Sequence, residues 1–394
     1  MRVLAKDVVE AAKNNPGTDI EVFGWVHRIR DMGGVTFVIL RDRSGTVQLV
    51  LADTDKPGLT LESVIRAAGK PAQNEKAPGG AELRVSTVEL ISRADTDLPY
   101  QVNGDIAKTG LDVILDNRAL SLRSPKIRSI FRVQAAVIEA FSAYLRSLDF
   151  TEIKTSKLVG GGTEGGAELF EVEYFDRKVY LAQSPQIYKQ IMVASGMERV
   201  FEAAPAYRAE KHDTPRHLNE YVSLDVEMGF IDSEKDLIEL EKGLLAHIFE
   251  QVAVKNGADL AAWNAKVPDP ASVDKAPTVP YEEALKIANA EAAKHSGGRI
   301  FDINPEAERL LCEWAARQGG AELVFVNEFP RRYRPFYTYP LDAVRTMSFD
   351  CLFRGLEITT GGRRQHDYRA LLDILPKFGL KPEDIKGYEV FKYG

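Results

Sequence analysis

The sequence predicts an α+β protein with two domains, a small N-terminal β-barrel and a larger antiparallel sheet flanked by helices. The chain has 394 residues, which exceeds the usual size of a single domain. Residues 20–91 contain short β-like runs separated by turns, a pattern typical of a small barrel. After residue 126, amphipathic helices alternate with strands that read as antiparallel. This order favours α+β over a doubly wound parallel sheet.

Composition and charge are those of a folded globular protein. Hydrophobic residues make up 44% of the chain and charged residues 28%. The net charge of −7 argues against indiscriminate nucleic-acid binding, which needs a broad basic surface, but leaves room for a local basic patch. We find no apolar run of membrane-spanning length and no signal-peptide pattern. Cys312 and Cys351 form neither a disulfide framework nor a CxxC metal motif, so we expect a cytoplasmic protein without a membrane partner.

The barrel is predicted from the first strands of the chain. Three β-runs follow an N-terminal helix: residues 20–29, 35–42 and 46–52. MGG and RSG supply the turns between them. We expect a helix at residues 60–68 and a further strand at 82–91. Between residues 70 and 76 the chain reads as roughly one strand short of a barrel.

Strands of this kind predict a barrel of the oligonucleotide-binding (OB) type, whose exposed face binds single strands by stacking and cationic contacts. Four arginines lie near aromatic and amide side chains in these runs: Arg28, Arg30, Arg41 and Arg43, beside Trp25, Phe37 and Gln48. Composition alone favours the rings as barrel core and the arginines as a solvated rim. We assign residues 1–93 to this domain and residues 94–125 to an ordered hinge.

The second domain is organised around residues 201–230, FEAAPAYRAEKHDTPRHLNEYVSLDVEMGF. Two apolar arms enclose a densely charged segment, which predicts a strand, a loop and a strand. Asp225 and Glu227 lie inside the apolar second arm, where unpaired charge is costly. We therefore predict a polyanion site beside a pocket for a cation. A solvated hairpin loop is the alternative for the charged segment.

Other motifs surround this hairpin. GGGTEGG at residues 160–166 is a candidate lid with Glu164 at its tip. In LAQSPQIYKQ, Gln186 and Lys189 share a helix face. Helices are expected at residues 128–148, 233–256, 281–295 and 304–318, and strands at 321–327, 334–338 and 346–359. No GxGxxG or Walker motif occurs, so a nucleotide would bind by another route.

Several segments resemble one family. FxxxPxYRAEKHDTPRHLNEY…LDVEM is similar to motif 2 of class II aminoacyl-tRNA synthetases. LAQSPQIYKQ, GTEGGAELF and RGLEITTGGRRQHDY resemble the aspartyl branch in its compact archaeal form. Asparaginyl enzymes share much of this pattern, but Arg-Pro-Phe-Tyr-Thr at residues 334–338 resembles the aspartyl enzymes. The resemblance implies an OB-type anticodon-binding domain followed by a class II catalytic domain at residues 126–394.

The implied activity is the attachment of L-aspartate to tRNA-Asp. ATP and aspartate form an aspartyl-adenylate, and the terminal ribose hydroxyl of the tRNA then attacks the acyl carbon. The family further implies a homodimer and Mg²⁺. Asp350 and Glu357 match the magnesium ligands, hard oxygen donors suited to a cation that bridges phosphates, so that Glu357 also belongs to the ATP site.

The resemblance assigns the nucleotide site residue by residue. Arg208 would contact the α-phosphate and the attacking carboxylate, a task that suits its planar bidentate fork. Glu210 would approach the adenine and ribose, and Tyr221 would stack on the adenine. Arg216 and His217 would hold the outer phosphates.

The amino-acid site follows in the same way. Arg364 would pair with the side-chain carboxylate of aspartate, supported by Lys189. Asp225, Gln186 and Glu164 would meet the ammonium group and the polar groups around it. Asparagine would leave Arg364 without a charged partner, and this difference would provide discrimination.

The anticodon site is assigned to the barrel. Phe37 matches the residue that stacks on the central anticodon base, and Gln48 matches the residue that reads it. His27 stands where similar enzymes restricted to tRNA-Asp have a tryptophan. A smaller residue there is compatible with use of both tRNA-Asp and tRNA-Asn.

Two departures from the family pattern concern catalysis and assembly. The chain stops at Gly394, before the motif 3 segment expected from the family, and Ser156 replaces the usual proline of motif 1 at the dimer interface. The first departure favours a non-catalytic tRNA-binding paralogue as an alternative. Asparaginyl-tRNA synthetase is a second alternative. An asparagine-forming paralogue is a third, although it would not need the barrel.

Overall fold

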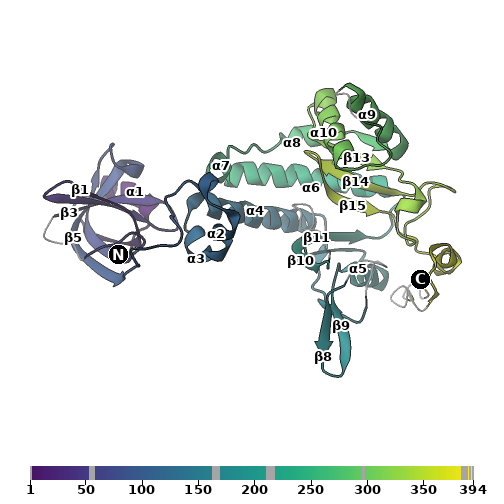
Figure 1. Cartoon of the computed structure of the whole chain (residues 1–394), viewed down its shortest axis with the longest axis horizontal. Helices are drawn as coiled ribbons and strands as arrows, with labels where there is room; N and C mark the ends of the chain where they lie inside the picture. The colour runs from purple at the N-terminus through teal and green to yellow at the C-terminus, as the bar shows by residue number, and fades with distance from the viewer. Residues whose placement is uncertain are drawn as a thin grey trace. The chain divides into compact units, whose positions relative to one another are not determined.

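The computed structural model describes residues 2–52, 58–161, 169–209, 218–294 and 298–382, together with residues 389 and 392. Contacts within the chain divide it into two units, Met1–Arg128 and Ser129–Gly394 (Figure 1). The domain boundaries expected at residues 93 and 125 stay a prediction. Across the described ranges, no helix is both long and apolar enough to span a bilayer.

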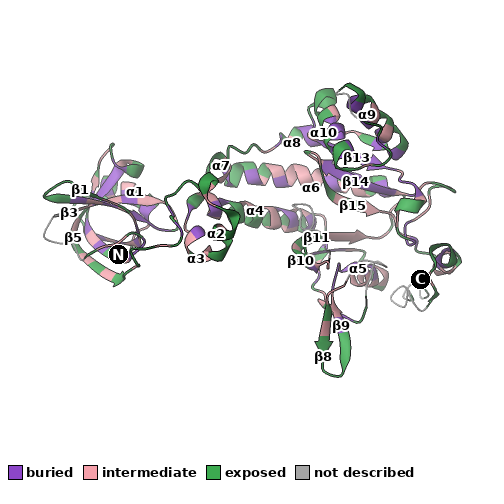
Figure 2. Ribbon diagram, viewed as in Figure 1, coloured by how far each residue is buried: buried purple, intermediate pink, exposed green. Residues whose placement is uncertain are grey.

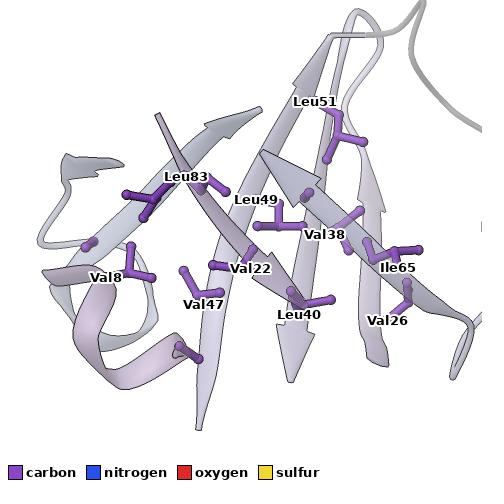
Figure 3. Close-up of a cluster of buried hydrophobic side chains, with 14 of the residues drawn as sticks. Val8, Val22, Val26, Val38, Leu40, Val47, Leu49, Leu51, Ile65 and Leu83 are labelled. Carbon is purple, nitrogen blue, oxygen red and sulfur yellow. The ribbon is translucent and has the colours of Figure 1, made fainter. Parts of the chain in front are cut away.

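The first unit closes five strands into a barrel. Its elements are α1 (Val8–Asn14), β1 (Ile20–Asp31), β2 (Val35–Arg41), β3 (Thr46–Ala52), β4 (Val64–Gln73) and β5 (Ala81–Ser92). The strands pair in the order β1-β2-β3-β5-β4, and β4 pairs back with β1. Alternate side chains point inward and pack against Val8 of α1 (Figure 3). The predicted closed barrel is confirmed.

The helix predicted at residues 60–68 is wrong, and the barrel is not one strand short. Val64–Gln73 forms β4 instead. Its side chains alternate, with Ile65 and Ala67 in the core and Lys70 exposed. The alanine-rich composition hid this period of two, because alanine favours helices but also fits a crowded barrel interior.

Arg41 is buried within the first unit, so its assignment to an exposed arginine face is wrong. Its guanidinium donates hydrogen bonds of 3.0 and 2.6 Å to the two oxygens of Glu62, and it lies 2.6 Å from Nδ1 of His27. Arg123 donates a further bond of 3.1 Å to Glu62, and its guanidinium carbon lies 5.5 Å from the centre of the Trp25 ring. Loss of either arginine would leave the buried Glu62 carboxylate with fewer compensating charges, which is costly away from water.

Residues between the barrel and the second unit carry two short helices, α2 (Leu111–Asp116) and α3 (Arg118–Ser121). They surround a small core that contains Tyr100, Val102 and Ile127. Arg123 follows α3, so the bond to Glu62 joins this segment to the barrel. The first unit is therefore the barrel together with the segment that follows it.

The second unit combines helices with short and long strands. Its helices are α4 (Pro125–Ser147, which begins in the first unit), α5 (Gln186–Met192), α6 (Glu234–Lys255), α7 (Gly257–Ala261), α8 (Pro270–Val273), α9 (Tyr281–Lys294), α10 (Pro305–Gly319) and α11 (Tyr368–Ile374). Its strands are β6 (Thr151–Glu152), β7 (Leu158–Val159), β8 (Glu171–Tyr174), β9 (Arg177–Leu181), β10 (Arg199–Tyr207), β11 (Glu220–Met228), β12 (Thr278–Pro280), β13 (Leu323–Asn327), β14 (Ser348–Phe353) and β15 (Leu356–Gly362).

The strands of the second unit pair mostly antiparallel. The hydrogen-bonded orders are β11-β10-β6, β12-β13-β14-β15 and β7-β9-β8, with β10–β6 and β12–β13 parallel. The predicted α+β architecture and its four long helices are confirmed. The strand predicted at residues 334–338 is wrong, since only Thr338 forms an isolated bridge, with Arg364. Pro335 has no N–H to donate to a ladder.

Helices cover both faces of the sheet β12–β15 (Figure 1). On one face, Ile238 of α6 packs with Phe325 and Phe349. On the other, α9 and α10 pack around Val326 and Leu352. The central strands β13 and β14 are accordingly buried (Figure 2). This packing makes the sheet a rigid platform for the side chains at its edge.

Among the acidic residues buried in this packing, Glu241 has an oxygen that is unsatisfied within the described part of the chain. Glu241 of α6 is 8% exposed, and its Oε1 has no hydrogen-bond partner in the described ranges. Burial raises the pKa of Glu241 to about 7, against hydrogen bonds with Thr359 and Cys351 that lower it. The folded protein therefore holds a proton on Glu241 up to a higher pH than the unfolded chain, whose ordinary pKa is 4.5.

We predict that this group makes the protein less stable as pH rises from about 4.5 to 7, because in that window only the unfolded state releases the proton. Glu241→Gln should be close to neutral at pH 5 and stabilise by roughly 2–3 kcal/mol at pH 8. Urea unfolding at both pH values measures this effect. The exposed Glu239→Gln on the same helix is the matched control, and parallel pH profiles for Glu241→Gln and the unaltered chain would contradict the prediction.

Candidate functional site

The antiparallel strands β10 and β11 confirm the two predicted arms, while residues 210–217 of the predicted loop lie outside the described ranges. Tyr221 lies opposite Ala206, and the N–H of Arg208 donates to the carbonyl of Asn219 at 2.9 Å, which extends the ladder beyond both strands. The Arg208 guanidinium carbon lies 5.6 Å from the centre of the Tyr221 ring. A cation and an aromatic ring thus project together from the two arms. This arrangement suits a ligand with phosphates and a flat base.

Four predicted site residues lie outside the described ranges: Glu164, Glu210, Arg216 and His217. Their proposed contacts with the ammonium group, the adenine and the outer phosphates stay predictions. The structure brings together the remaining members of the predicted site in the second unit, as follows.

Lys189 of α5 reaches the acidic residues of β11. Its Nζ lies 2.9 Å from Oδ1 of Asp225 and 3.5 Å from Oε2 of Glu227, and Ser223 donates to the second oxygen of Asp225 at 2.5 Å. Burial would lower the pKa of Lys189, but the two carboxylates outweigh burial and raise it. Burial likewise opposes ionisation of Asp225, yet the Lys189 charge and the Ser223 bond hold the Asp225 pKa below its usual value. Both partners are therefore ionised at neutral pH.

Arg364 follows β15 and turns toward α5. Its NH2 donates to Oε1 of Gln186 at 2.9 Å, and its guanidinium carbon lies 4.6 Å from the centre of the Tyr337 ring. Gln186 is 2% exposed, and its Nε2 has no hydrogen-bond partner within the described ranges. An unsatisfied buried donor is costly, so Gln186 Nε2 is a candidate to bind a ligand oxygen.

These contacts place two cations near two carboxylates. Lys189 and Arg364 are close enough for the Arg364 charge to oppose protonation of Lys189. Asp225 and Glu227 supply the opposite charge from β11. This cluster of side chains therefore offers groups of both signs to a small zwitterion that carries an additional carboxylate.

Asp350 of β14 and Glu357 of β15 lie on one face of their strand pair, because Asp350 opposes Thr360 and Leu352 opposes Glu357. Burial raises the pKa of Asp350, against the neighbouring Arg334 charge. Desolvation of the carboxylate and the Asp350 charge raise the pKa of Glu357 to about 7, although the residue as a whole is exposed. The positive charges of Arg334 and Arg208 oppose this rise. The two carboxylates thus repel each other beside the Arg208 end of the hairpin.

The Asp350 and Glu357 pair fits a cation that is shared with a ligand. In the described part of the chain, no three or more His, Cys, Asp or Glu side chains gather as a metal site. Mg²⁺ is commonly held by one or two carboxylates together with substrate phosphates, and these hard donors match that pattern. A cation would also relieve the repulsion between the two carboxylates.

The sequence reasoning missed two residues of this site. Arg334, which was assigned to a strand, places NH2 2.6 Å from Oδ1 of Asp350 and NH1 3.1 Å from Thr360, and its guanidinium carbon lies 3.8 Å from the centre of the Phe329 ring. Ser223 was overlooked although it lies two residues before Asp225, on the same strand face. That spacing could have identified Ser223, whereas no local signal identified the partner of Arg334.

The motif 1 segment is fastened to β10 by a buried acid. Glu202 is 1% exposed and accepts hydrogen bonds from the N–H and hydroxyl of Thr155, at 2.8 and 2.7 Å. Lys157 lies 3.1 Å from the same carboxylate. Ser156 between them is exposed and donates its hydroxyl hydrogen bond to the carbonyl of Leu158 at 2.8 Å. Position 156 therefore lies at the surface on a segment that is held in place.

Phe37 and Gln48 lie on the outer face of the barrel. Val38 and Leu49 beside them point into the core, while Phe37 and Gln48 remain partly exposed. Gln48 donates Nε2 to Glu82 at 3.2 Å. Composition alone favoured Phe37 as a core residue, and that interpretation is wrong. The contacts of both residues with an anticodon stay predictions.

Two family models match the chain. The model described as tRNA synthetases class II (D, K and N) matches residues 110–394, and the model described as OB-fold nucleic acid binding domain matches residues 20–91. The second match agrees with the barrel described above, and the first covers the whole of the second unit.

Relatives align over nearly all of the chain. Aspartate–tRNA(Asp/Asn) ligase of Thermus thermophilus is 46% identical over 396 residues, which span 100% of this chain and 91% of that protein. Aspartate–tRNA(Asp) ligase of Pyrococcus horikoshii is 38% identical and spans 96% and 88%. The crystal structure of asparaginyl-tRNA synthetase from Pyrococcus horikoshii with asparaginyl-adenylate matches with a TM-score of 0.88 and 27% identity, covering 98% of this chain and 89% of that one.

We predict that Asp225→Asn destabilises the second unit by about 3 kcal/mol at pH 7, because it removes the carboxylate in closest contact with the buried Lys189 ammonium. Thermal and urea unfolding measure the loss. The triple variant Lys189→Met with Asp225→Asn and Glu227→Gln should recover most of it, since the buried ammonium and both carboxylates that contact it are then gone. Equal stability of Asp225→Asn and the unaltered chain would refute the pairing as an energetic feature.

Proposed function

The chain belongs to the aspartate–tRNA ligase family of class II tRNA synthetases, and we propose that it uses ATP to attach L-aspartate both to tRNA-Asp and to tRNA-Asn. The observation that carries the amino-acid assignment is the convergence of Arg364 and Gln186 beside the Lys189–Asp225 pair. Use of ATP follows from the family. We place the reaction in the cytoplasm, where tRNA is charged for translation.

Arg364 is proposed to bind the side-chain carboxylate of aspartate. A guanidinium forms two parallel hydrogen bonds with a carboxylate but not with an amide, so asparagine would lose both charge and geometry. Gln186 already holds one edge of the Arg364 guanidinium at 2.9 Å, which limits its rotation. Asp225 would accept from the ammonium of the substrate, with Lys189 and Ser223 holding its carboxylate in place.

Arg208 and Tyr221 are proposed to bind ATP. Tyr221 would offer its ring to the adenine, and Arg208 would contact the α-phosphate. When bound, Mg²⁺ would neutralise charge on the phosphates, with Asp350 and Glu357 as its protein ligands. The raised pKa of Glu357 means that this ligand must lose its proton near neutral pH before it can bind a cation.

In the proposed first step, an oxygen of the aspartate α-carboxylate attacks the α-phosphorus of ATP. The new P–O bond forms as the bond to pyrophosphate breaks, and pyrophosphate leaves with that electron pair. Arg208 would stabilise the charge on the reacting phosphate. In the second step, the terminal ribose hydroxyl of tRNA attacks the acyl carbon, loses its proton and displaces AMP. The protein forms no covalent intermediate, so orientation of the reactants is its main contribution.

The barrel is proposed to read the anticodon, with Phe37 stacking on the central base and Gln48 contacting its edge. Two observations support use of both tRNAs. The 46% identical relative carries the name aspartate–tRNA(Asp/Asn) ligase. His27 replaces the tryptophan expected in tRNA-Asp-restricted enzymes, so the ring at this position is smaller. Burial together with the Arg41 charge lowers the pKa of His27 to about 4, so the ring is neutral at pH 7.

A homodimer is also proposed. Exposed apolar side chains lie on α4 and on β7, the strand that follows Ser156: Ile130, Phe131 and Leu158. Exposed apolar side chains on ordered elements suit a permanent interface. Sedimentation equilibrium at micromolar concentration tests this proposal, and a purely monomeric chain would refute it.

We predict that Arg364→Gln raises the KM for aspartate at least 100-fold in aspartate-dependent ATP–pyrophosphate exchange. The loss of a charge-assisted bidentate pair, about 3 kcal/mol, accounts for this size. Arg363→Gln is the matched control, because the neighbouring Arg363 donates to the carbonyl of Asp232 instead. Exchange stimulated by asparagine rather than aspartate in the unaltered chain would refute the aspartate assignment. No exchange with either amino acid would support the non-catalytic alternative.

We predict that the unaltered chain charges tRNA-Asp and tRNA-Asn transcripts with similar kcat/KM. His27→Trp should lower charging of tRNA-Asn at least tenfold relative to tRNA-Asp, because the larger ring fills space near the anticodon site. Arg41 loses its imidazole acceptor in this variant, so a thermal melt must accompany the assay. A strict preference of the unaltered chain for tRNA-Asp would refute the dual range.

A further inference from the structure

Cross-strand register aligns a row of side chains on the outside of the barrel. Phe37 lies opposite Arg30 on one side and opposite Val50 on the other. Val50 pairs in turn with Arg84, and Arg84 with Lys70. The row therefore crosses all five strands, from β1 through β2, β3 and β5 to β4. It reads cation, aromatic ring, aliphatic, cation and cation.

The members of this row face solvent. Arg30, Arg84 and Lys70 are exposed, while Phe37 and Val50 are partly exposed. Their strand neighbours point the other way, since Val38, Leu49, Leu51 and Leu83 are all buried in the barrel core (Figure 3). The exposed side of the pleat thus carries the row as one continuous surface.

Two like charges directly opposite each other weaken a sheet, and Lys70 and Arg84 form such a pair. Folding alone gives no reason to place them there. Glu82 approaches Arg84 at 3.7 Å, but its other oxygen accepts hydrogen bonds from Gln48 and Asn74. The Arg84 side chain is 72% exposed, and no ion pair to Lys70 is formed by any residue in the described ranges.

The same two cations border an open hollow. The hollow has a volume of about 730 Å³ and lies between the end of α1 and the strands β4 and β5. Pro71, Gln73, Arg84 and Ser86 line it together with Lys70, and Asp19 is the single acid on its wall among the described residues. Its charge and its hydrogen-bond donors suit a phosphodiester backbone.

We propose that Lys70 and Arg84 form a phosphate-binding track that continues the anticodon site along the row from Phe37. This inference rests on the proposed function, because tRNA is its occupant. Three interstrand spacings separate Phe37 from Lys70, roughly 14 Å, which is about four stacked nucleotides. A base on Phe37 therefore leaves the backbone of the same anticodon arm within reach of both cations.

Backbone contacts position a nucleic acid but do not read its sequence. The track therefore adds affinity equally for tRNA-Asp, tRNA-Asn and a tRNA with a changed anticodon. It also adds salt dependence, since each phosphate contact releases counterions. Anticodon-independent affinity and salt dependence distinguish the contribution of Lys70 and Arg84 from that of Phe37 and Gln48. Loss of Phe37 or Gln48 would instead change the discrimination between anticodons.

The test measures binding of tRNA-Asp, and of its isolated anticodon stem-loop, to the full chain across salt concentrations. The double variant Lys70→Gln with Arg84→Gln should weaken binding about tenfold at low salt and reduce the slope of log Kd against log salt by roughly 1.5. The loss should be equal for the stem-loop and for a tRNA with a changed anticodon. Lys286→Gln, an exposed cation on α9, is the matched control with no expected change.

The charge-preserving pair Lys70→Arg with Arg84→Lys should keep the slope of the unaltered chain, which separates lost charge from disturbed folding. An unaltered chain that binds tRNA with the same slope as the double glutamine variant would overturn the track and leave the proposed function standing. A loss confined to one anticodon would also overturn it. An unaltered chain that binds no tRNA would overturn both.

Discussion

The ion pair between Lys189 and Asp225 is the interaction on which the proposed amino-acid site depends. A buried ammonium needs a carboxylate in contact, and here the carboxylate comes from β11, while the lysine comes from α5. The pair therefore fixes the position of α5 against the hairpin. Because Gln186 lies one turn before Lys189 on the same helix, the ion pair also positions Gln186, which accepts the hydrogen bond from Arg364. One charge pairing thus brings residues from three segments together at the proposed amino-acid site.

Other buried charges in the chain follow the same requirement. Asp350 is paired with Arg334, which arrives from a loop rather than from the sheet. Glu202 collects Thr155 and Lys157 and so holds the segment before β7 against β10. In each case the partner lies far away in sequence. Charge pairing therefore helps to hold these connecting segments against the strands.

Local patterns predicted the elements better than they predicted the pairings. Period-2 and period-3.6 hydrophobicity located most of the barrel strands, the two arms of the β10–β11 hairpin and the long helices. The predicted helix at residues 233–256 corresponds to α6, which begins at a capping box formed by Ser233 and Asp236. The helix prediction was wrong at β4, where alanine composition favours a helix but closure of the barrel requires a strand. The strand prediction was also wrong at Arg334, whose strand-like neighbours gave no sign of its bond to Asp350. Such long-range bonds depend on tertiary geometry and leave no local periodicity.

Site residues were found mainly through family resemblance, not through periodicity. The polar hairpin alone predicted a polyanion site beside a cation pocket, and Asp225 stood out because it interrupts an apolar strand. Nothing local indicated that Arg364 and Gln186 would meet, since 178 positions separate them. The structure adds what resemblance could not supply: the bond that orients each group, and Ser223 as a further partner of Asp225.

The network of Arg41, Glu62 and Arg123 has a practical consequence for dissecting the molecule. A fragment that ended with the last barrel strand, at residue 92, would lose the guanidinium that covers Trp25 and completes the shell around Glu62. It would also lose Asn103, which donates to the carbonyl of His27. An autonomous barrel for spectroscopy or crystallisation should therefore extend through residue 128, where the first unit ends. The structural unit is thus larger than the five-stranded barrel, because Asn103 and Arg123, which follow the last barrel strand, complete its hydrogen bonds.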